Sequence, residues 1–189
     1  MKAIIEMKNR AKIIILRGSV TGQEVCAIVN AANPTLLGGS GVDGEIHREA
    51  GPKLLEECRS LGGCLTGEAK LTKAYDLKNA KYIIHTVGPV YHGKEEDAQL
   101  LRSAYQSALE RALEKDCDSV AFPCISAGVF GYPLREAARI AILSAYDWLK
   151  AHPEKKMEIR LCCYRDNELD VYLEILGQLL KNKVIENGI

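Results

Sequence analysis

The chain has 189 residues, 47% of them hydrophobic and 26% charged, and its 25 basic and 25 acidic side chains cancel to a formal net charge of zero. This length and composition predict one soluble globular domain, residues 1–189, with a core of ordinary size. A neutral chain exerts no long-range attraction on nucleic acid or anionic membranes. We therefore expect neither partner, and any bound phosphate has to be held locally.

The N-terminal segment and the cysteines predict where the protein resides. MKAIIEMKNRAKIIILRG contains no long apolar stretch and no cleavage-site pattern, and no apolar run approaches the ~20 residues of a membrane span. The seven cysteines are odd in number, and their spacing resembles no zinc site. Several lie in apolar strand-like runs, where cysteine behaves as a small buried hydrophobe. We expect structural thiols, no metal, and a reducing compartment such as the cytoplasm.

Strand and helix patterns alternate along the chain. Continuous apolar runs such as IIIL, YIIHTV and VAFPCI are typical of strands that are covered on both faces. The patterns predict strands at 2–6, 12–16, 25–29, 69–74, 82–87, 119–125 and 158–164, and helices at 44–61, 95–115, 133–150 and 167–182. This order predicts an α/β fold, a three-layer α/β/α sandwich. Because no helix separates the first two strands, the central sheet should be mixed, and ligands should bind beyond the carboxyl ends of its central strands.

The most informative segment is IVNAANPTLLGGSGVDGEIHREAG, residues 28–51, which follows the third predicted strand. Four of its residues between 38 and 44 are glycines, so the backbone can turn sharply and approach a ligand closely. It also leads into a helix, whose free N–H groups and dipole favour an anion. We interpret it as a phosphate-binding loop with a carboxylate, Asp43, set into it. The alternative is that Asp43 only caps the helix.

Gly39, Gly41 and Gly44 also match the spacing G-x-G-x-x-G of dinucleotide-binding folds. In those folds the glycines follow their strand directly, and an acidic residue at the end of the next strand binds the ribose. Here NAANPTLL lies between strand and glycines, and the position about twenty residues further on falls near the end of the predicted helix. The pattern therefore disfavours a dinucleotide-dependent dehydrogenase.

A second glycine-containing loop, ISAGVFGYP at residues 125–133, lies at an equivalent junction between a strand and a helix. Two such loops side by side can hold both phosphates of one diphosphate through their backbone N–H groups. The pair of loops indicates a diphosphate ligand more strongly than either loop alone.

Taken in order, the motifs NAAN, LLGGSGVDGEIHREAGP, EECRSLGGCLTGEAKLTKAY, YIIHTVGP and PCISAGVFGYP resemble the macrodomain family, in particular its MacroD-type branch. The match runs in register over roughly residues 16–172. The resemblance implies a domain that binds ADP-ribose and hydrolyses ADP-ribose esters, either on Asp or Glu side chains of proteins or in O-acetyl-ADP-ribose. It implies no metal and no other cofactor. The alternative is a module that binds ADP-ribose, or a related nucleotide, without turnover.

The resemblance also implies roles for individual residues. Asn33 would hold the distal ribose, and Asp43 would orient or activate the attacking water; these two form the catalytic pair. Tyr164 would stack on adenine beside the backbone of Val20, and Phe130 would lie against the distal ribose. The remaining predicted lining residues of the two loops and the strand end are Ala31, Gly41, Val42, Ser126, Ala127, Gly128 and Val129.

Three further polar residues near these motifs have structural interpretations. Asn30 is expected to brace the first loop by bonding backbone groups. His47, four residues after Asp43, is expected to pack on the helix face; the alternative is an Asp43–His47 acid–base dyad. His85 lies in an apolar strand and is expected to be a hydrogen-bonded core histidine.

At Ser19 the chain departs from the family pattern, which usually has an aspartate there whose carboxylate accepts a hydrogen bond from the adenine amino group. A serine is shorter and uncharged, so this bond would be lost or mediated by water. Hydrogen bonds of this kind are worth about 1.5–3 kcal/mol, or about one to two decades of affinity. From the sequence alone we therefore expect Ser19→Asp to tighten ADP-ribose binding by about threefold or more. A changed base or ligand is a further alternative.

Overall fold

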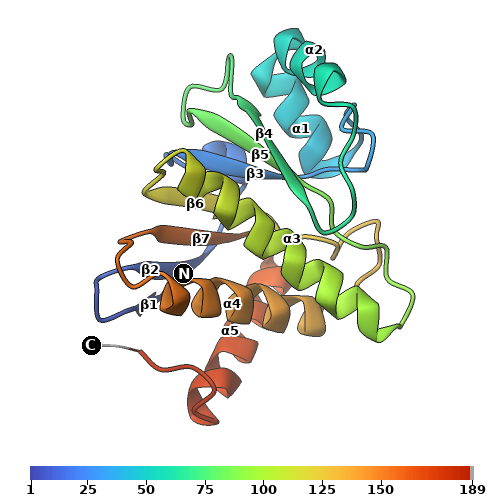
Figure 1. The fold of residues 1–189 in the computed structure, drawn as a ribbon. Helices are drawn as coiled ribbons and strands as arrows, with labels where there is room; N and C mark the ends of the chain where they lie inside the picture. Colours follow the sequence, from blue (N-terminus) through green and yellow to red (C-terminus); the bar gives the residue numbers. More distant parts are fainter. Residues whose placement is uncertain (188–189) are drawn as a thin grey trace.

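The computed structural model describes residues 1–187, which form a seven-stranded sheet flanked by helices (Figure 1). The strands are β1 (Lys2–Glu6), β2 (Lys12–Arg17), β3 (Ala27–Ala31), β4 (Ala69–Lys73), β5 (Tyr82–Thr86), β6 (Ser119–Phe122) and β7 (Glu158–Cys163). The helices are η1 (Val20–Gly22, a 3-10 turn), α1 (Gly41–Ala50), α2 (Pro52–Leu61), α3 (Glu95–Glu114), α4 (Leu134–Ala151) and α5 (Asp166–Lys181). None of the helices within residues 1–187 is long and apolar enough to cross a membrane.

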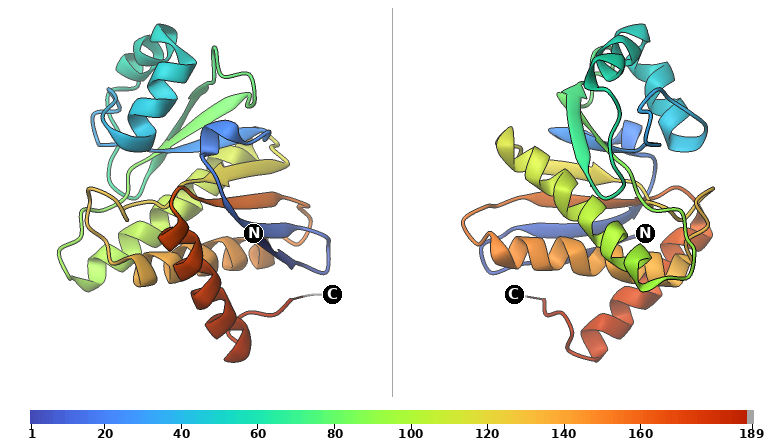
Figure 2. Two further views of the ribbon diagram at one scale, coloured as in Figure 1. Left: turned by 180° about the vertical axis from the view of Figure 1, so that it is seen from behind. Right: turned by 45° about the vertical axis from the view of Figure 1, so that its right-hand side comes forward.

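The helices form layers on both sides of the sheet, which confirms the predicted sandwich. Helices α3 and α4 cover one face, and α1 and α2 cover the other (Figures 1 and 2). Neighbouring residues of the central strand β3 point into different cores: Val29 packs in the core shared with α3, α4 and α5, whereas Ile28 packs in the core shared with α1 and α2. Both faces of the central strands are therefore buried, as their continuous apolar runs indicate.

The strand order is β1-β2-β7-β6-β3-β5-β4. The edge strands β1 and β4 run antiparallel to β2 and β5, and the strands between them are parallel, so the sheet is mixed as expected. The second antiparallel pair arises because only a short connection, residues 74–81, joins β4 to β5, and a parallel crossover needs a longer one. The carboxyl ends of β2, β7, β6, β3 and β5 consequently lie along one edge of the sheet.

Several predicted boundaries differ from the structure. Strand β3 lies at Ala27–Ala31 rather than 25–29, and α1 begins at Gly41 rather than at 44. Two further errors come from proline or glycine. The single helix expected over 44–61 is two helices, because Gly51 adopts a left-handed φ of 82° and Pro52 cannot donate the hydrogen bond that a continuing helix needs. Strand β6 ends at Phe122 rather than 125, immediately before Pro123. Its chain therefore leaves the sheet early and enters the second glycine-containing loop.

The structure joins Cys26 to Cys117 in a disulfide, so the expectation of thiols is wrong for this pair. Cys117 lies between α3 and β6, and the parallel pairing of β6 with β3 brings it to the start of β3, with 5.5 Å between the two Cα atoms. The sequence separation of 91 residues hid this proximity. The other five cysteines are free, and Cys124 is the only one of them that is not fully buried among the described residues.

Candidate functional site

A cavity of about 430 Å³ opens at the carboxyl edge of the sheet. Predicted residues from four separate segments line it: Ser19 and Val20 after β2, Gly41 and Val42 at the start of α1, Ala127 and Gly128 after β6, and Tyr164 after β7. Its other lining residues are Gly18, Glu45, Arg48, Pro123, Cys124, Cys162, Arg165 and Glu168. The structure thus brings together residues that the sequence placed up to about 145 positions apart.

The remaining predicted residues lie outside the wall of this cavity. Ala31 ends β3, and Asn33 and Asp43 approach each other over Gly39; a Cβ atom on Gly39 would lie 3.1 Å from Asp43 Oδ2 and 3.5 Å from Asn33 Nδ2. The others belong to the loop after β6: Ser126, Val129 and Phe130. Asp43 directly follows the lining residue Val42, and Ser126 and Val129 flank the lining residues Ala127 and Gly128 in the chain.

The carboxylate of Asp43 is buried, with 5% of the residue exposed. It lies inside the first turn of α1, whose N-cap is Ser40, and its Oδ1 accepts a hydrogen bond from Asn30 Nδ2 at 2.8 Å. Asp43 is therefore not the N-cap. Burial raises the pKa of Asp43 above its ordinary value, while the bond from Asn30 and the nearby His47 act in the opposite direction.

A chain of buried side chains behind Asp43 holds Asn30 in place. The Asn30 amide also donates to His85 Nδ1 at 3.1 Å, because an amide nitrogen can only donate, and His85 Nε2 then donates to the Thr72 hydroxyl at 2.9 Å. Burial, with a smaller effect of His47, lowers the pKa of His85 to about 3, which keeps the ring neutral and consistent with these roles. His85 is the hydrogen-bonded core histidine that was predicted, whereas Asn30 bonds side chains rather than the expected backbone groups.

His47 Nε2 lies 3.4 Å from Asp43 Oδ1, and the His47 side chain is 15% exposed. Within residues 1–187 this buried nitrogen makes no hydrogen bond. The structure therefore gives His47 the i,i+4 proximity that an acid–base dyad requires, in addition to the packing role that the sequence favoured.

The side chain of Asn33 braces the first loop. Its Oδ1 accepts from the Thr35 backbone N–H at 3.0 Å and from the Thr35 hydroxyl, and its Nδ2 donates to the Gly38 carbonyl at 2.9 Å. This is the turn role of asparagine before proline. One amide hydrogen stays free for a ligand, because Nδ2 carries two.

The second loop contains an unusual serine. Ser126 has a left-handed φ of 64°, is 6% exposed, and its hydroxyl has no hydrogen-bond partner among the described residues. Gly88 leaves room for it, since a Cβ atom there would collide with Ser126 Oγ and Ile125. Strained residues with an unpaired polar atom concentrate at ligand sites. By contrast, Val129 at the tip is 92% exposed.

Glu45 is one of the eight cavity-lining residues that the sequence analysis did not predict, and it bonds to a predicted one. Its Oε1 accepts hydrogen bonds from the hydroxyls of Ser19 at 2.6 Å and Thr21 at 2.5 Å. Tyr164, 61% exposed, lies on the same cavity wall, with the Arg17 guanidinium 6.0 Å from its ring centroid. The signal in the sequence was a second acidic residue two positions after Asp43, but only the fold shows that it reaches Ser19.

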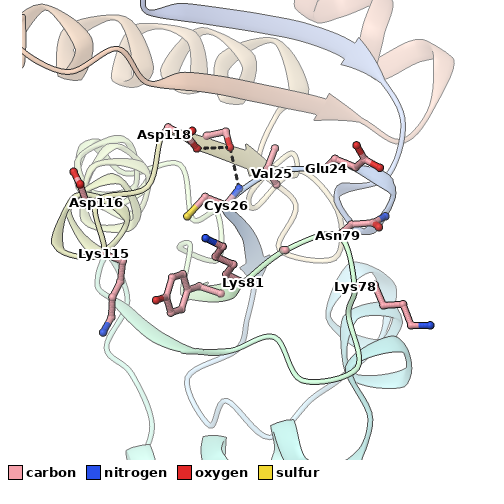
Figure 3. Close-up of a pocket in the computed structure, with 12 residues that line it drawn as sticks. Glu24, Val25, Cys26, Lys78, Asn79, Lys81, Lys115, Asp116 and Asp118 are labelled. Carbon is pink, nitrogen blue, oxygen red and sulfur yellow. Dashed lines mark hydrogen bonds between the residues drawn. The ribbon is translucent and has the colours of Figure 1, made fainter.

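A second hollow, of about 510 Å³, lies near the amino ends of β3, β5 and β6 (Figure 3). Its wall carries basic side chains, Lys78, Lys81 and Lys115, and an equal number of acidic ones, Glu24, Asp116 and Asp118. None of the predicted site residues lies there. This hollow is a poor site for a diphosphate, because its charges are mixed and it lies at the amino ends of the strands rather than at their carboxyl ends.

Comparison with known proteins gives concordant results. The family model described as Macro domain matches residues 29–141. A macro domain-containing protein of Chlorobaculum tepidum is 52% identical over 90% of this chain and 99% of its own length. The Bos taurus protein named ADP-ribose glycohydrolase MACROD1 is 50% identical over 87% of this chain, which spans only 51% of that longer relative.

Solved structures agree with the sequence relatives. The Oceanobacillus iheyensis macrodomain with ADP has a TM-score of 0.90 at 34% identity, covering 96% of this chain and 98% of that one. The Trypanosoma brucei macrodomain in complex with ADP-ribose has a TM-score of 0.81 at 45% identity, covering 87% of this chain and 69% of that one. With the family model matching more than half of the sequence and the fold superposing over nearly all of it, this chain belongs to the macrodomain family.

Proposed function

We propose that this protein, as a single domain, binds ADP-ribose and hydrolyses ADP-ribose esters, either on acidic side chains of proteins or in O-acetyl-ADP-ribose. The observation that carries the proposal is the buried Asp43 carboxylate, held by Asn30 next to a glycine-rich loop and a cavity at the carboxyl edge of the sheet. Relatives of about 50% identity that are named ADP-ribose glycohydrolases support it.

In this proposal the two loops hold the diphosphate. Backbone N–H groups at Gly41 and Val42 and in the segment 126–130 bind its oxygens. Asn33 and Phe130 position the distal ribose, and the adenine lies between Tyr164 and the backbone of Val20. Ala31, at the end of β3, would contribute to the same binding site.

Asp43 then orients and polarises the attacking water, with positioning as the main contribution to the rate. The carboxylate has to be ionised to accept the water's proton. Because burial raises the pKa of Asp43, activity should fall on acidification at a higher pH than for an ordinary aspartate. Asn30 limits this rise, since its hydrogen bond stabilises the ionised form.

The test is a time course of free ADP-ribose released from a glutamate-ADP-ribosylated protein, with the enzyme in catalytic amount. Release of many equivalents per enzyme would support the hydrolase. Binding of ADP-ribose without release, from this substrate and from O-acetyl-ADP-ribose, would contradict it and favour the second candidate, a reader module. The free amide hydrogen of Asn33 and the buried Asp43 favour turnover over reading alone.

The bond that breaks can be identified with ¹⁸O-labelled water. Attack at the acyl carbon places ¹⁸O in the released glutamate carboxylate, whereas attack at the ribose carbon leaves that carboxylate unlabelled. The names of the glycohydrolase relatives favour the second outcome. A monomeric state and a cytoplasmic location remain predictions from the sequence.

A further inference from the structure

Glu45 occupies an unusual electrostatic position in the cavity wall. None of the ion pairs among residues 1–187 includes its carboxylate. Instead, two neutral hydroxyls, those of Ser19 and Thr21, donate to the same oxygen, Oε1. Both hydroxyls come from the segment after β2, whereas Glu45 lies on α1, so the contact also fixes these two segments to each other.

The second carboxylate oxygen is available to a ligand. Within residues 1–187 no side-chain hydrogen bond ends on Oε2, and Glu45 is half-buried and lines the cavity. An ionised carboxylate is an acceptor only, so Oε2 selects a donor. If Glu45 only connected α1 to the segment after β2, the hydrogen bonds to Oε1 would be sufficient.

The surroundings of Glu45 fit the edge of a flat heteroaromatic group. The same wall contains the exposed ring of Tyr164, the backbone of the buried Val20, and the apolar side chains of Pro123 and Cys162. Aromatic rings stack on nucleobases, and carboxylates accept from exocyclic amino groups.

From this arrangement we propose that Glu45 is the residue of this chain that selects adenine, by accepting a hydrogen bond from its exocyclic amino group on Oε2. The carboxylate therefore comes from α1, in place of one at position 19, where this chain has a serine that holds Glu45 instead. The inference rests on the proposed ADP-ribose site and specifies how that site reads the base.

Because the hydroxyls of Ser19 and Thr21 already bond to Oε1, Glu45 should also prefer adenine to guanine. A carboxylate with both oxygens free can pair with the two adjacent donors of guanine, whereas Glu45 offers one. Adenine, which has a single amino donor on that edge, matches the one free acceptor, Oε2. Hypoxanthine has a carbonyl oxygen in place of the amino group. Because both this oxygen and the carboxylate are acceptors, no hydrogen bond can form between them.

The experiment compares the binding of ADP, IDP and GDP to the full chain by calorimetric titration. The wild type should bind ADP at least about fivefold more tightly than IDP or GDP. In Glu45→Gln the side-chain oxygen can still accept from Ser19 and Thr21, and its amide can donate to the hypoxanthine carbonyl. The ADP:IDP preference should therefore fall at least about fivefold, with IDP binding itself becoming tighter.

Glu49→Gln is the matched control, because Glu49 is an exposed glutamate on the same helix that does not line the cavity. Its ADP:IDP ratio should equal that of the wild type. An unchanged ratio in Glu45→Gln, with ADP binding and ester turnover intact, would overturn the role of Glu45 and leave the proposed function standing. Absence of ADP and ADP-ribose binding in the wild type would overturn both.

Discussion

Helix α1 carries two carboxylates two residues apart, Asp43 and Glu45, and their surroundings differ. Asp43 is 5% exposed and receives one amide hydrogen bond, from Asn30, which a buried network holds from behind. Glu45 is half-buried, receives two hydroxyl hydrogen bonds on one oxygen, and lines an open cavity. Burial raises the pKa of Asp43 above its ordinary value.

The comparison indicates that the two carboxylates of α1 have different roles. Asp43 and Glu45 point to different sides of α1, because residues two positions apart are separated by about 200° around a helix of 3.6 residues per turn. One side meets β3 and the first loop, and the other meets the segment after β2. The first carboxylate should control the rate of hydrolysis, and the second should control affinity and choice of base.

Asp43→Ala should have the largest effect of the substitutions on α1. We expect kcat to fall about 10²–10⁴-fold, because a positioned base is lost, while affinity for ADP-ribose stays within about threefold. Glu45→Ala should show the reverse, with lower affinity and a kcat within about threefold of the wild type. Initial rates on a glutamate-ADP-ribosylated protein and titrations with ADP-ribose measure both. Full turnover in Asp43→Ala, with binding intact, would show that the role assigned to Asp43 is wrong.

Asn30→Ala should have the next largest effect, lowering kcat by about tenfold. Because the Asn30 amide stabilises the ionised carboxylate, its loss should raise the pKa of Asp43 further and move the acidic limb of the pH–rate profile to higher pH. The profile of kcat between pH 4 and 8 measures this shift.

A merely structural role of Asn30 predicts a different pattern, namely a lower rate with the acidic limb unmoved. A double-mutant cycle adds a second check. If Asn30 acts through Asp43, removing it in the Asp43→Ala background should cause no further loss of kcat.

Ser19→Asp tests the surroundings of Glu45. The sequence alone led to the expectation of tighter binding, but the structure places the Ser19 hydroxyl 2.6 Å from Glu45, so an aspartate would set two carboxylates against each other. We now expect ADP-ribose affinity to stay level or fall by about threefold in the single variant. In the Glu45→Ala background, Ser19→Asp should instead tighten binding by about threefold, as measured by titration.

The smallest expected effect is on stability, in Asp43→Asn. A carboxyl whose folded pKa lies above its unfolded value of 3.8 binds more protons in the folded state, so stability falls as pH rises through the window between those two values. Replacing this buried charge by a neutral amide should therefore raise Tm at pH 7, and a gain of 1 kcal/mol corresponds to about 2–4 °C for a chain of this size. The difference should shrink towards pH 4. A Tm at pH 7 equal to or below that of the wild type would contradict it.

The alternation of strands and helices, the mixed sheet and the two glycine loops could all be predicted from the sequence. These features depend on local rules: buried parallel strands are continuous apolar runs, and glycines mark tight turns. The same local rules failed where one residue changes the backbone path, as at Gly51 and Pro123. Asp43 was predicted as a site residue because it is set directly within the glycine segment.

The contacts between distant side chains could not be predicted from the sequence and depend on the fold. Glu45 bonds to Ser19 and Thr21 in the cavity wall, Asn30 bonds to His85 on the neighbouring strand, and Cys26 is joined to Cys117, 91 residues away in the sequence. Each contact depends on strand order and on the direction in which a helix face points, and neither is encoded in a short window of sequence. Ser19 therefore looked like a lost contact in the sequence, whereas in the fold it holds the carboxylate of Glu45.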